Sequence, residues 1–444
     1  MNINLPTEVQ YIITTLESAG FEAYAVGGCV RDSLLGKEPQ DWDICTSALP
    51  EQCIETFSDQ RIVETGLKHG TITLMLNEKP FEITTFRVDG KYTDNRRPDK
   101  VKFVTVLKRD LARRDFSVNA MAYNPKTGVM DYYDGQQDLE NRLIKCVGNA
   151  DKRFREDALR IMRALRFASS FGFSIEENTA RAMFDNRKLL QNIASERIVI
   201  ELNKLIMGDA VFELLTDHLP VIFEIIPELE PTAGVEQNNS YHCFDVLTHI
   251  LKSVDAAPKN LIIRLTMLLH DIGKPHCYTE SEDGIGHFYG HQQKGSDMAR
   301  DILARLKYDK DMIKTVTELI LYHDQDIEPR CKHIKRWLNK IGETRIRQLL
   351  EVKHADAAAQ SETHRQIKAE KLKAIPPLID EVISQQQCFS LKDLAVNGRD
   401  IINANLAEGT QIGVMLNRLL EMVINEEVEN EREVLMEIAR KLAK

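Results

Sequence analysis

YAVGGCVRDSLLGKEPQDWDIC, residues 24–45, is the stretch of sequence that decides the fold. Its first residues, 24–26, are apolar and predict a short β-strand. Gly27 and Gly28 follow. Because glycine carries no Cβ, the backbone there can approach a ligand closely. Arg31 comes three residues later, well placed for its guanidinium to contact an anionic group. The stretch therefore predicts a βα-like segment that holds an anion at its glycine turn.

Two aspartates in the same stretch suit a metal ion that carries a nucleotide. If residues 41–45 form a strand, side chains alternate, and Asp41 and Asp43 both emerge on one face. Two carboxylates beside a glycine turn and an arginine suit Mg²⁺ bound to a nucleoside triphosphate. A turn with two solvated aspartates is the alternative, because a DxD pair alone is common. The glycine pair, VRD and DWD within one segment are a much more specific combination, which favours the nucleotide site.

A third carboxylate is predicted from the next strands. Residues 71–87 alternate between apolar and polar side chains and predict two strands around a turn at residues 77–80. In the second strand Glu82 lies on the face opposite to Phe81 and Ile83, so it is a candidate partner of the two aspartates. The alternative is a charge on an edge strand that faces water.

Composition indicates a soluble globular protein with several domains. A chain of 444 residues is too long for one hydrophobic core, so two to four domains are expected. No run of 18 apolar residues and no N-terminal signal pattern occurs, so neither a membrane span nor secretion is expected. The eight cysteines form no CxxC pair, as in a cytoplasmic protein with reduced thiols.

The net charge of −10 argues mildly against a nucleic-acid-binding protein, but binding needs only a local basic surface. Residues 96–114 hold eight basic and two acidic residues, and residues 330–373 hold twelve basic and five acidic residues. Each of these segments either contacts RNA or is a solvated face whose positive charge is balanced by acidic residues elsewhere.

The motifs together resemble a known family. GGxVRD followed by DxD is similar to the head of the tRNA nucleotidyltransferase and poly(A) polymerase family, class II, and in particular of the bacterial CCA-adding enzymes. The resemblance covers nearly the whole chain. It implies an α/β, polymerase-beta-like nucleotidyltransferase head followed by an all-α neck, an HD-containing body and a tail. The expected domains are the head 1–148, the neck 149–210, the body 211–340 and the tRNA-binding tail 341–444.

Two further head motifs agree with this family. RRDFSVNA, residues 113–120, resembles the family's RRDFTxNA, which implies that Arg114 contacts the nucleotide. Residues 88–100 are polar and rich in turn formers, so a mobile loop is expected. In CCA-adding relatives a flexible loop at this place is needed to add the final A.

The neck carries the residues that would select the base. Residues 155–172 are predicted to be a helix, with Asp157 and Arg160 three apart on one face. A surface salt bridge is the ordinary interpretation of this pair. Glu156-Asp157-Ala-Leu-Arg160 matches the family's EDxxR motif, however, and Arg163 and Arg166 follow as in the family.

Base-edge chemistry explains how such a pair selects C and A. Both bases present an amino donor next to a ring acceptor, which suit a carboxylate and an arginine respectively. Uracil and guanine present the reverse order, and each buried polar group left unpaired costs roughly 1–3 kcal/mol. A carboxylate–arginine pair can therefore replace a nucleic-acid template.

A second group of residues resembles the HD phosphohydrolase superfamily. LLHDIGKP contains His270 and Asp271, and the other candidates for metal ligands are His242, His291, His323 and Asp324. Imidazole and carboxylate ligands suit a transition-metal ion. The alternative is a fold kept for its shape alone.

The resemblance implies an enzyme that adds and repairs the 3′-terminal CCA of tRNA from CTP and ATP. Asp41 and Asp43, with Glu82 as a third carboxylate, would be catalytic and hold Mg²⁺; Gly28 and Arg31 would meet the triphosphate. The expected partners are the tRNA acceptor end, CTP and ATP, without DNA or membrane. An A-adding enzyme, a poly(A) polymerase, an HD phosphohydrolase with a nucleotide-binding head and a non-catalytic RNA-binding module are the alternatives.

Overall fold

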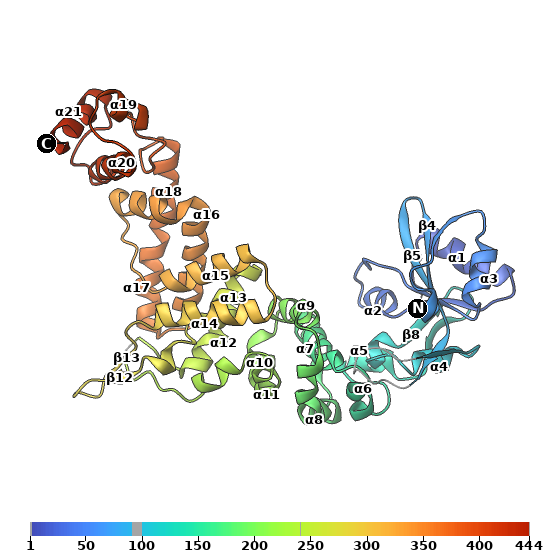
Figure 1. Ribbon diagram of the computed structural model, residues 1–444. Coiled ribbons are helices and arrows are strands. Elements are labelled where there is room, and N and C mark those ends of the chain that lie inside the picture. Colours follow the sequence, from blue (N-terminus) through green and yellow to red (C-terminus); the bar gives the residue numbers. More distant parts are fainter. Residues whose placement is uncertain (1, 91–99, 240, 444) are drawn as a thin grey trace. The chain divides into compact units, whose positions relative to one another are not determined.

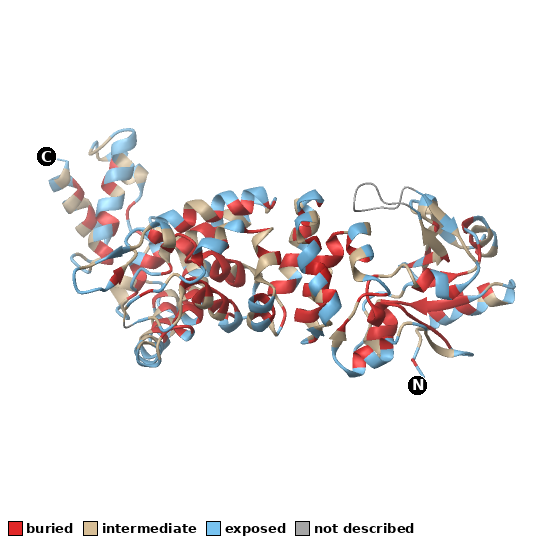
Figure 2. Ribbon diagram, turned by 90° about the horizontal axis from the view of Figure 1, so that it is seen from below, coloured by how far each residue is buried: buried red, intermediate tan, exposed pale blue. Residues whose placement is uncertain are grey.

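The structure is a computed structural model that describes residues 2–90, 100–239 and 241–443. It divides into two compact units, Met1–Pro227 and Glu228–Lys444 (Figure 1). In each unit the buried residues gather on the sheet and on the inner faces of the helices (Figure 2). The division into four domains stays a prediction. Most of the expected loop at residues 88–100 lies outside the described residues.

The first unit begins with an α/β head built on a mixed sheet. In its described part the strand order is β3-β4-β5-β2-β1-β8-β9, with β2 and β5 parallel and the other neighbours antiparallel. The strands of this sheet are β1 Ala23–Val26, β2 Ile44–Thr46, β3 Arg61–Val63, β4 Thr71–Leu76, β5 Lys79–Thr85, β8 Met121–Asn124 and β9 Gly128–Asp131. A separate pair joins β6 Arg87–Asp89 and β7 Val101–Phe103. The expected α/β head is confirmed.

Turn chemistry explains the hairpin that carries Glu82. Strands β4 and β5 pair from Thr71↔Thr84 to Leu76↔Lys79, which leaves Asn77 and Glu78 as a two-residue turn. Both have positive φ, 49° and 63°, as the favoured two-residue hairpin turns require. The predicted hairpin is confirmed, and Glu82 is exposed between the buried Phe81 and Ile83.

Helices surround the sheet and continue into the neck. The head helices are α1 Thr7–Ser18, α2 Gly28–Leu34, α3 Pro50–Thr56, α4 Leu107–Leu111 and α5 Gly135–Glu140. The neck helices are α6 Ala150–Glu156, α7 Leu159–Phe171, α8 Glu177–Asn186, α9 Ser195–Ile206, α10 Val211–Asp217 and α11 Leu219–Phe223. Helices α7 and α9 pack against each other, and Ser169 Oγ on α7 donates a 2.7 Å hydrogen bond to the carbonyl of Leu205 on α9.

As far as its residues are described, the second unit is helical apart from one short hairpin. Its body consists of α12 Val246–Ala256, α13 Leu261–Leu269, β12 Thr279–Glu280, β13 Gly286–His287, α14 His291–Arg305, α15 Lys310–Tyr322 and α16 Cys331–Ala358. Side chains of Asp245, Asn260 and Asp309 accept backbone N–H groups at the starts of α12, α13 and α15, as N-cap residues do. Within the described chain, no helix combines the length and apolar character needed to cross a membrane.

The tail forms its own hydrophobic cluster after two connecting helices. The elements are α17 Glu362–Lys373, α18 Ile375–Ser384, α19 Gly398–Asn403, α20 Thr410–Ile424 and α21 Arg432–Leu442. Ile401, Leu419 and Leu435, one from each of the last three helices, are fully buried in one cluster. The α/β head followed by helical neck, body and tail agrees with the predicted fold class.

Gly273, in the HDIGKP motif, allows two body segments to approach each other. A Cβ at Gly273 would lie 2.5 Å from the carbonyl oxygen of His291 and 2.7 Å from the backbone nitrogen of Gly295. Both atoms belong to the first turns of α14, so only glycine lets this helix pack against the turn that follows α13. This packing brings His291 next to Asp271.

Gly273→Ala should therefore destabilise the second unit by about 1–3 kcal/mol, because a backbone clash cannot be relieved by a rotamer change. Gly413→Ala is the matched control: Gly413 lies inside α20 with nothing within 4 Å of an added Cβ. That variant should be neutral or more stable by up to about 1 kcal/mol. Calorimetric unfolding measures both, and equal effects of the two variants would contradict the close-approach explanation.

Candidate functional site

The three head carboxylates lie where β2 and β5 run side by side. The predicted strand over residues 41–45 is wrong at its start, since β2 begins at Ile44. The amide of Val26 still donates a 2.9 Å hydrogen bond to the carbonyl of Asp43, which keeps that residue beside β1. Ile44 pairs with Ile83, so Glu82 on β5 is adjacent in register to Asp43.

Electrostatic interactions couple these carboxylates. Partial burial raises the pKa of Asp43, Asp41 raises it further, and the Arg114 guanidinium opposes both effects. Burial followed by repulsion from Asp43 and Asp41 raises the pKa of Glu82. Mutual repulsion of this kind is relieved by a bound cation, and an all-oxygen set of ligands suits Mg²⁺. The groups of three ligand atoms within 4.8 Å that the described residues contain lie in the body rather than here.

Arg114 faces the glycine turn. Gly27 has a φ of 84°, which favours glycine, and a Cβ there would lie 2.7 Å from Arg114 Nη1 and displace that guanidinium. Asp110, which is fully buried, lies 3.8 Å from Arg114 Nη2 and holds the guanidinium in place. Gly28, the predicted contact, has a more open environment. The sequence pattern pointed to Gly28, whereas the tighter backbone constraint in the structure is at Gly27. The positive φ of Gly27 could not be read from the sequence.

Arg31 is buried and already has partners. Its guanidinium contacts Asp32 at 2.8 Å and donates to Asn119 Oδ1, and it lies over the rings of Phe167 and Phe171 at 5.2 and 4.8 Å. This arrangement fixes α2 against the neck. Arg31 therefore supports the glycine turn from behind.

Asp157 and Arg160 do not share one helix. The predicted helix over residues 155–172 is wrong at its start, because α6 ends at Glu156 and Asp157 is extended, with φ −135° and ψ 105°. Asp157 Oδ1 accepts a 3.1 Å hydrogen bond from the amide of Leu159, where α7 begins. A short acidic side chain that accepts an amide in this way favours a helix start over a helix interior.

In the structure each member of the pair has another partner. Asp157 Oδ2 lies 3.3 Å from Arg197 on α9. Arg160 is buried, donates at 2.9 Å to Glu156, and donates at 3.0 Å to the carbonyl of Arg113 in the head. Arg197 was not expected from the sequence, because its partner Asp157 lies 40 residues earlier in the chain.

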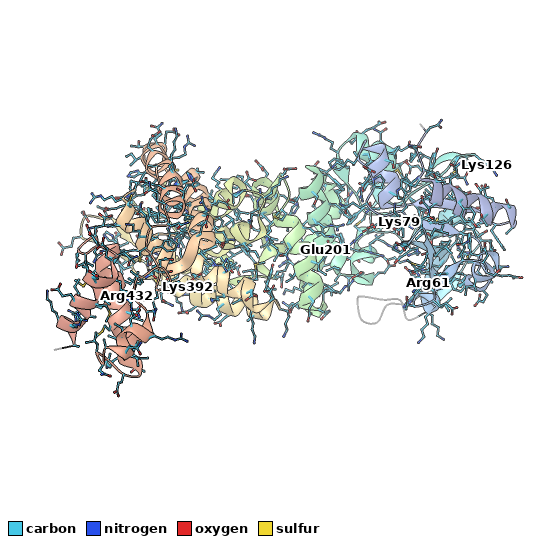
Figure 3. All side chains as sticks on the ribbon, turned by 90° about the horizontal axis from the view of Figure 1, so that it is seen from above. Arg61, Lys79, Lys126, Glu201, Lys392 and Arg432 are labelled. Carbon is cyan, nitrogen blue, oxygen red and sulfur yellow. The ribbon has the colours of Figure 1, made fainter. Side chains whose placement is uncertain are left out.

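Arg163 and Arg166 line the same side of α7. Arg163 donates two hydrogen bonds, of 2.8 and 2.5 Å, to Asp115. Burial would raise the pKa of Asp115, but Arg163 and then Arg160 lower it far below its ordinary value. Arg166 pairs with Glu201 at 3.1 Å and lies 3.9 Å from the Phe167 ring centroid; Figure 3 labels Glu201 on α9. The predicted arginines thus lie at the junction of head and neck.

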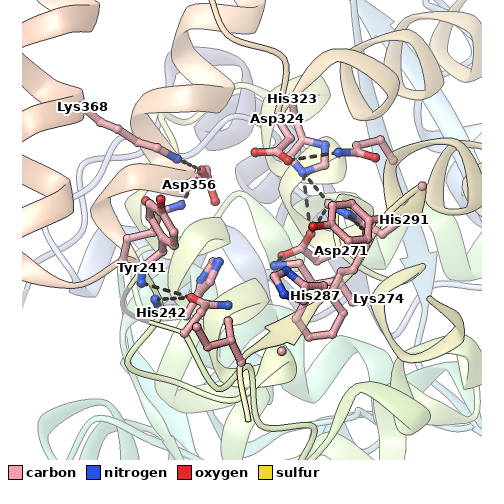
Figure 4. A pocket seen from close by; sticks show the side chains of 18 residues that line it. Tyr241, His242, Asp271, Lys274, His287, His291, His323, Asp324, Asp356 and Lys368 are labelled. Atoms are coloured by element: carbon pink, nitrogen blue, oxygen red, sulfur yellow. Dashed lines mark hydrogen bonds and ion pairs between the residues drawn. The ribbon is translucent and has the colours of Figure 1, made fainter. Parts of the chain in front are cut away.

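The body contains a buried cluster of histidines and carboxylates from four helices and the turn after α13. His249 and His270 lie 3.5 and 3.2 Å from Asp271 Oδ2, and His291 and His323 lie 3.4 and 3.6 Å from Oδ1. Asp356 on α16 completes the cluster, 3.0 Å from His249 Nε2. Figure 4 shows Asp271 beside His291 and His323, and Asp356 joined to Lys368.

The imidazoles are oriented as metal ligands. Each ring turns Nδ1 to a backbone carbonyl, those of Ala359, Met267, Phe288 and Ile320 in chain order, at 2.6 to 3.1 Å. A carbonyl only accepts, so the proton of a neutral ring lies on Nδ1 and the Nε2 lone pair faces the cluster. His249 and His270 Nε2 atoms are only 3.2 Å apart, and those of His291 and His323 3.4 Å. Lone pairs this close repel unless a proton or a metal ion lies between them.

The charge of the cluster favours a cation as well. Burial lowers the pKa of His291 to about 4, so this ring is neutral near pH 7. Burial opposes ionisation of Asp271, but the surrounding cationic groups hold its pKa well below the ordinary value. Lys274 Nζ lies 2.7 Å from Asp271 Oδ2, and neither oxygen of Asp271 accepts a hydrogen bond of good geometry from the described residues.

Two predicted body residues lie at the rim, and two cluster residues were missed. His242 packs its ring edge-on against His249 at 4.9 Å, and Asp324 is exposed and accepts from Gln292. Neither belongs to the groups with metal-ligand spacing. The missed residues are His249 and Asp356. A histidine on the apolar face of VLTHILKSV and an aspartate among alanines in HADAAAQ are the signals that could have found them.

Comparison with known proteins identifies the family. Residues 23–145 match the poly A polymerase head domain, residues 172–230 match the "Probable RNA and SrmB- binding site of polymerase A", and residues 279–439 match tRNA nucleotidyltransferase domain 2. The head, neck and body therefore all resemble nucleotidyltransferases that act on RNA ends.

Curated relatives and solved structures match this chain, some of them along nearly its whole length. The chain is 34% identical to the CCA-adding enzyme of Lactiplantibacillus plantarum, over 99% of this chain and 98% of the relative. It is 50% identical over 200 residues to the CCA-adding enzyme of Oceanobacillus iheyensis, over 45% of this chain and 50% of that relative. The crystal structure of the Bacillus stearothermophilus CCA-adding enzyme in complex with CTP matches with a TM-score of 0.70 and 30% identity, covering 98% of each chain. The chain belongs to the family of CCA-adding enzymes, which are nucleotidyltransferases.

Proposed function

We propose that this chain adds and repairs the 3′-terminal CCA of tRNA, using CTP and ATP and releasing pyrophosphate without a nucleic-acid template. The observation that carries the proposal is that one compact unit contains the three head carboxylates, the glycine turn and the segment proposed to read the base. Arg160 joins the last of these to the head through the carbonyl of Arg113. The full-length similarity to CCA-adding enzymes supports it.

Asp41 and Asp43, with Glu82 as the third carboxylate, would hold Mg²⁺. When bound, Mg²⁺ supplies activation of the tRNA 3′-hydroxyl and neutralisation of the triphosphate and the leaving pyrophosphate. Arg114, directed at the glycine turn, would bind the triphosphate, and Gly28 would let the backbone approach it. Because Arg31 is held by Asp32 and Asn119, its contribution is a positive charge behind that turn.

Asp157 and Arg160 would read the base, with Arg163 and Arg166 beside it. Asp157 would accept the amino group shared by C and A, and Arg160 would donate to the adjacent ring nitrogen. Arg197 and Glu156 are their partners in the structure, so binding of a nucleotide requires both side chains to exchange partners. Glu156 keeps a second cationic partner, Arg153 at 2.8 Å, when Arg160 leaves it.

The tail would hold tRNA and the chain would work in the cytoplasm. The excess of basic residues over 330–373 supports contact with a polyanion. All eight cysteines are free thiols, in keeping with a reducing compartment. An A-adding enzyme or a poly(A) polymerase would share the head, and the nucleotides incorporated distinguish these activities.

Asp43→Asn should lower addition of both C and A by about 10³-fold, because several kcal/mol of charge stabilisation are lost. Asp41→Asn should act alike, while tRNA affinity measured by filter binding stays within about twofold. Asp59→Asn, an exposed head residue whose carboxylate contacts Gln60, is the control and should be fully active. Normal turnover by the Asp43 variant would exclude the carboxylates from catalysis.

Arg160→Ile and Asp157→Ala should lose selectivity as well as rate. Arg160→Ile removes the N–H donor that faces, and is repelled by, the ring N–H of U or G. UTP or GTP should therefore be used at about a tenfold larger fraction of the CTP rate. Extension of a tRNA lacking CCA, with each triphosphate separately, gives these ratios. Arg155→Ile, an exposed residue paired with Asp151, is the control. A common slowing of all four nucleotides by both variants would mean that the base is selected elsewhere.

We also propose that the buried body cluster binds a transition-metal ion. Its imidazole and carboxylate ligands suit Mn²⁺, Fe²⁺, Co²⁺ or Ni²⁺. Neighbouring side chains orient these ligands. Gln360 and Lys368 hold Asp356 Oδ2 at 2.9 and 3.2 Å, which turns Oδ1 towards His249.

Elemental analysis of chelator-treated, Mn²⁺-reloaded and desalted protein tests this site. Asp356→Ala should lower the metal content, since it removes a ligand, whereas His242→Ala, at the rim, should retain it. CCA addition should persist in both variants, because the cluster lies in the other unit. Equal metal content in parent and Asp356 variant would refute the site.

A further inference from the structure

Among the described residues, three guanidiniums surround one aromatic ring, that of Phe167 on α7. The guanidinium carbon of Arg166 lies over this ring, 3.9 Å from its centroid, and those of Arg31 and Arg163 lie 5.2 and 5.3 Å from it. The face of an aromatic ring attracts a cation within about 6 Å, because the ring quadrupole is negative there. One uncharged side chain is therefore a shared partner of three cations.

We infer that Phe167 is a positioning residue for the incoming nucleotide, because its ring face holds these three arginines together at the junction of head and neck. The inference rests on the proposed addition of CCA and adds the group that arranges the arginines. Phe167 acts through the guanidiniums and itself binds neither the nucleotide nor tRNA.

The three arginines need such a partner because they repel one another. Burial lowers the pKa of Arg166, Glu201 opposes this effect, and repulsion from Arg163 and Arg31 contributes to the lowering. Arg31 belongs to α2 of the head, whereas the other two belong to α7 of the neck. Repulsion between them would therefore drive α2 away from α7 unless an attraction opposed it.

Carboxylates supply part of that attraction, one for each arginine. A carboxylate cancels the charge that it holds, however, and an anionic nucleotide is then attracted less. A ring face attracts cations without carrying charge, so it offsets their repulsion and leaves the positive potential in place. The carboxylate pairs are Arg31–Asp32 at 2.8 Å, Arg163–Asp115 at 2.5 Å and Arg166–Glu201 at 3.1 Å.

Two neighbouring rings fix the orientation of Phe167. Phe171 stacks on it with centroids 5.7 Å apart and planes 11° apart, and Phe116 meets it edge to face at 5.9 Å and 82°. Phe167 is only 6% exposed, so its ring is enclosed on the sides that the arginines leave. The ring therefore keeps its negative face, rather than its positive edge, towards the cations.

Exposure indicates which of the three arginines meets the nucleotide. The side chain of Arg163 is 32% exposed, whereas those of Arg31 and Arg166 are 9% and 13% exposed. Arg163 is thus the arginine that reaches a ligand, and the other two reinforce its charge from behind. Loss of the ring should weaken nucleotide binding without touching the surface that binds tRNA.

Stepwise fluorination of the Phe167 ring tests this role separately from packing. Mono-, di- and trifluorinated phenylalanine, incorporated at this position of the full chain, keep nearly the same shape while weakening the negative face in steps. The KM for CTP should rise at each step, to about tenfold with the trifluorinated ring. The KM for tRNA and the Tm should stay close to those of the parent.

The matched control is Phe184 on α8, which is 47% exposed and has Arg187 over its ring at 4.1 Å, outside the nucleotide site. The same fluorinated residues at Phe184 should leave the KM for CTP unchanged. An unchanged KM for CTP across the Phe167 series overturns the inference. A KM for tRNA that rises equally, or a Tm that falls in step, also overturns it, because packing alone would then explain the effect.

A natural substitution gives a second measurement. Phe167→Met keeps an apolar side chain but has no aromatic face, so its Kd for CTP, measured by equilibrium dialysis, should rise by about tenfold. Phe184→Met should bind CTP as the parent does. An unchanged Kd in Phe167→Met overturns the inference while the proposed function stands. A parent chain that adds neither C nor A overturns the proposed function, and the inference with it.

Discussion

The ion pair between Asp115 and Arg163 is the interaction on which the nucleotide site depends. Asp115 is 7% exposed and stays ionised because Arg163 and Arg160 surround it. Its other oxygen accepts hydrogen bonds from the Phe116 amide at 2.8 Å and from Asn119 at 3.1 Å. One buried carboxylate therefore joins helix α7 of the neck to the segment that precedes β8 of the head.

This pair extends into a network that reaches the glycine turn. Asn119 accepts from Arg31, and Arg31 lies over Phe167 and Phe171 of α7. The helix that would read the base and the helix that follows the glycine turn are thus fixed by the same few charges. A buried charge that loses its partner is strongly unfavourable, so the network has one arrangement rather than several. Rigid placement of this kind would allow protein side chains to replace a nucleic-acid template.

The body shows a different constraint. There the backbone fixes the site: four carbonyls orient four imidazoles, and Gly273 lets α14 approach closely enough to place His291. The Nε2 lone pairs of these rings are directed at Asp271, an arrangement that a protein interior does not favour without a cation. The two candidate sites lie in separate units and consist of separate residues, so the residues of each can be altered without those of the other.

Local patterns predicted most of the fold and about half of each site. Alternation placed Glu82 on the correct face of its strand, and the HDIGKP word identified His270 and Asp271, because both signals act over a few residues. The strand over residues 41–45 and the helix start at residue 155 were wrong. At Asp157 a hydrogen bond from the Leu159 amide to the side chain decides the boundary more finely than periodicity does.

His249 and Asp356 gave only weak local signals, because tertiary packing brings them together across more than a hundred residues. His249 lies on an apolar helix face where a core residue would look the same. Arg197 was missed for a related reason. Its partner Asp157 lies between α6 and α7, far from Arg197 in the sequence. Sequence reasoning named the chemistry of both sites, and the partners that orient it required the structure.

The central claim is that one site in the first unit builds CCA from two nucleotides without a template. Purified protein incubated with a tRNA that ends before CCA, and with CTP alone, ATP alone or both, tests it most directly. The account predicts two added residues with CTP, at most traces with ATP alone, and three with both, with growth stopping there. A long A tail from ATP alone, or no extension under any condition, would contradict it.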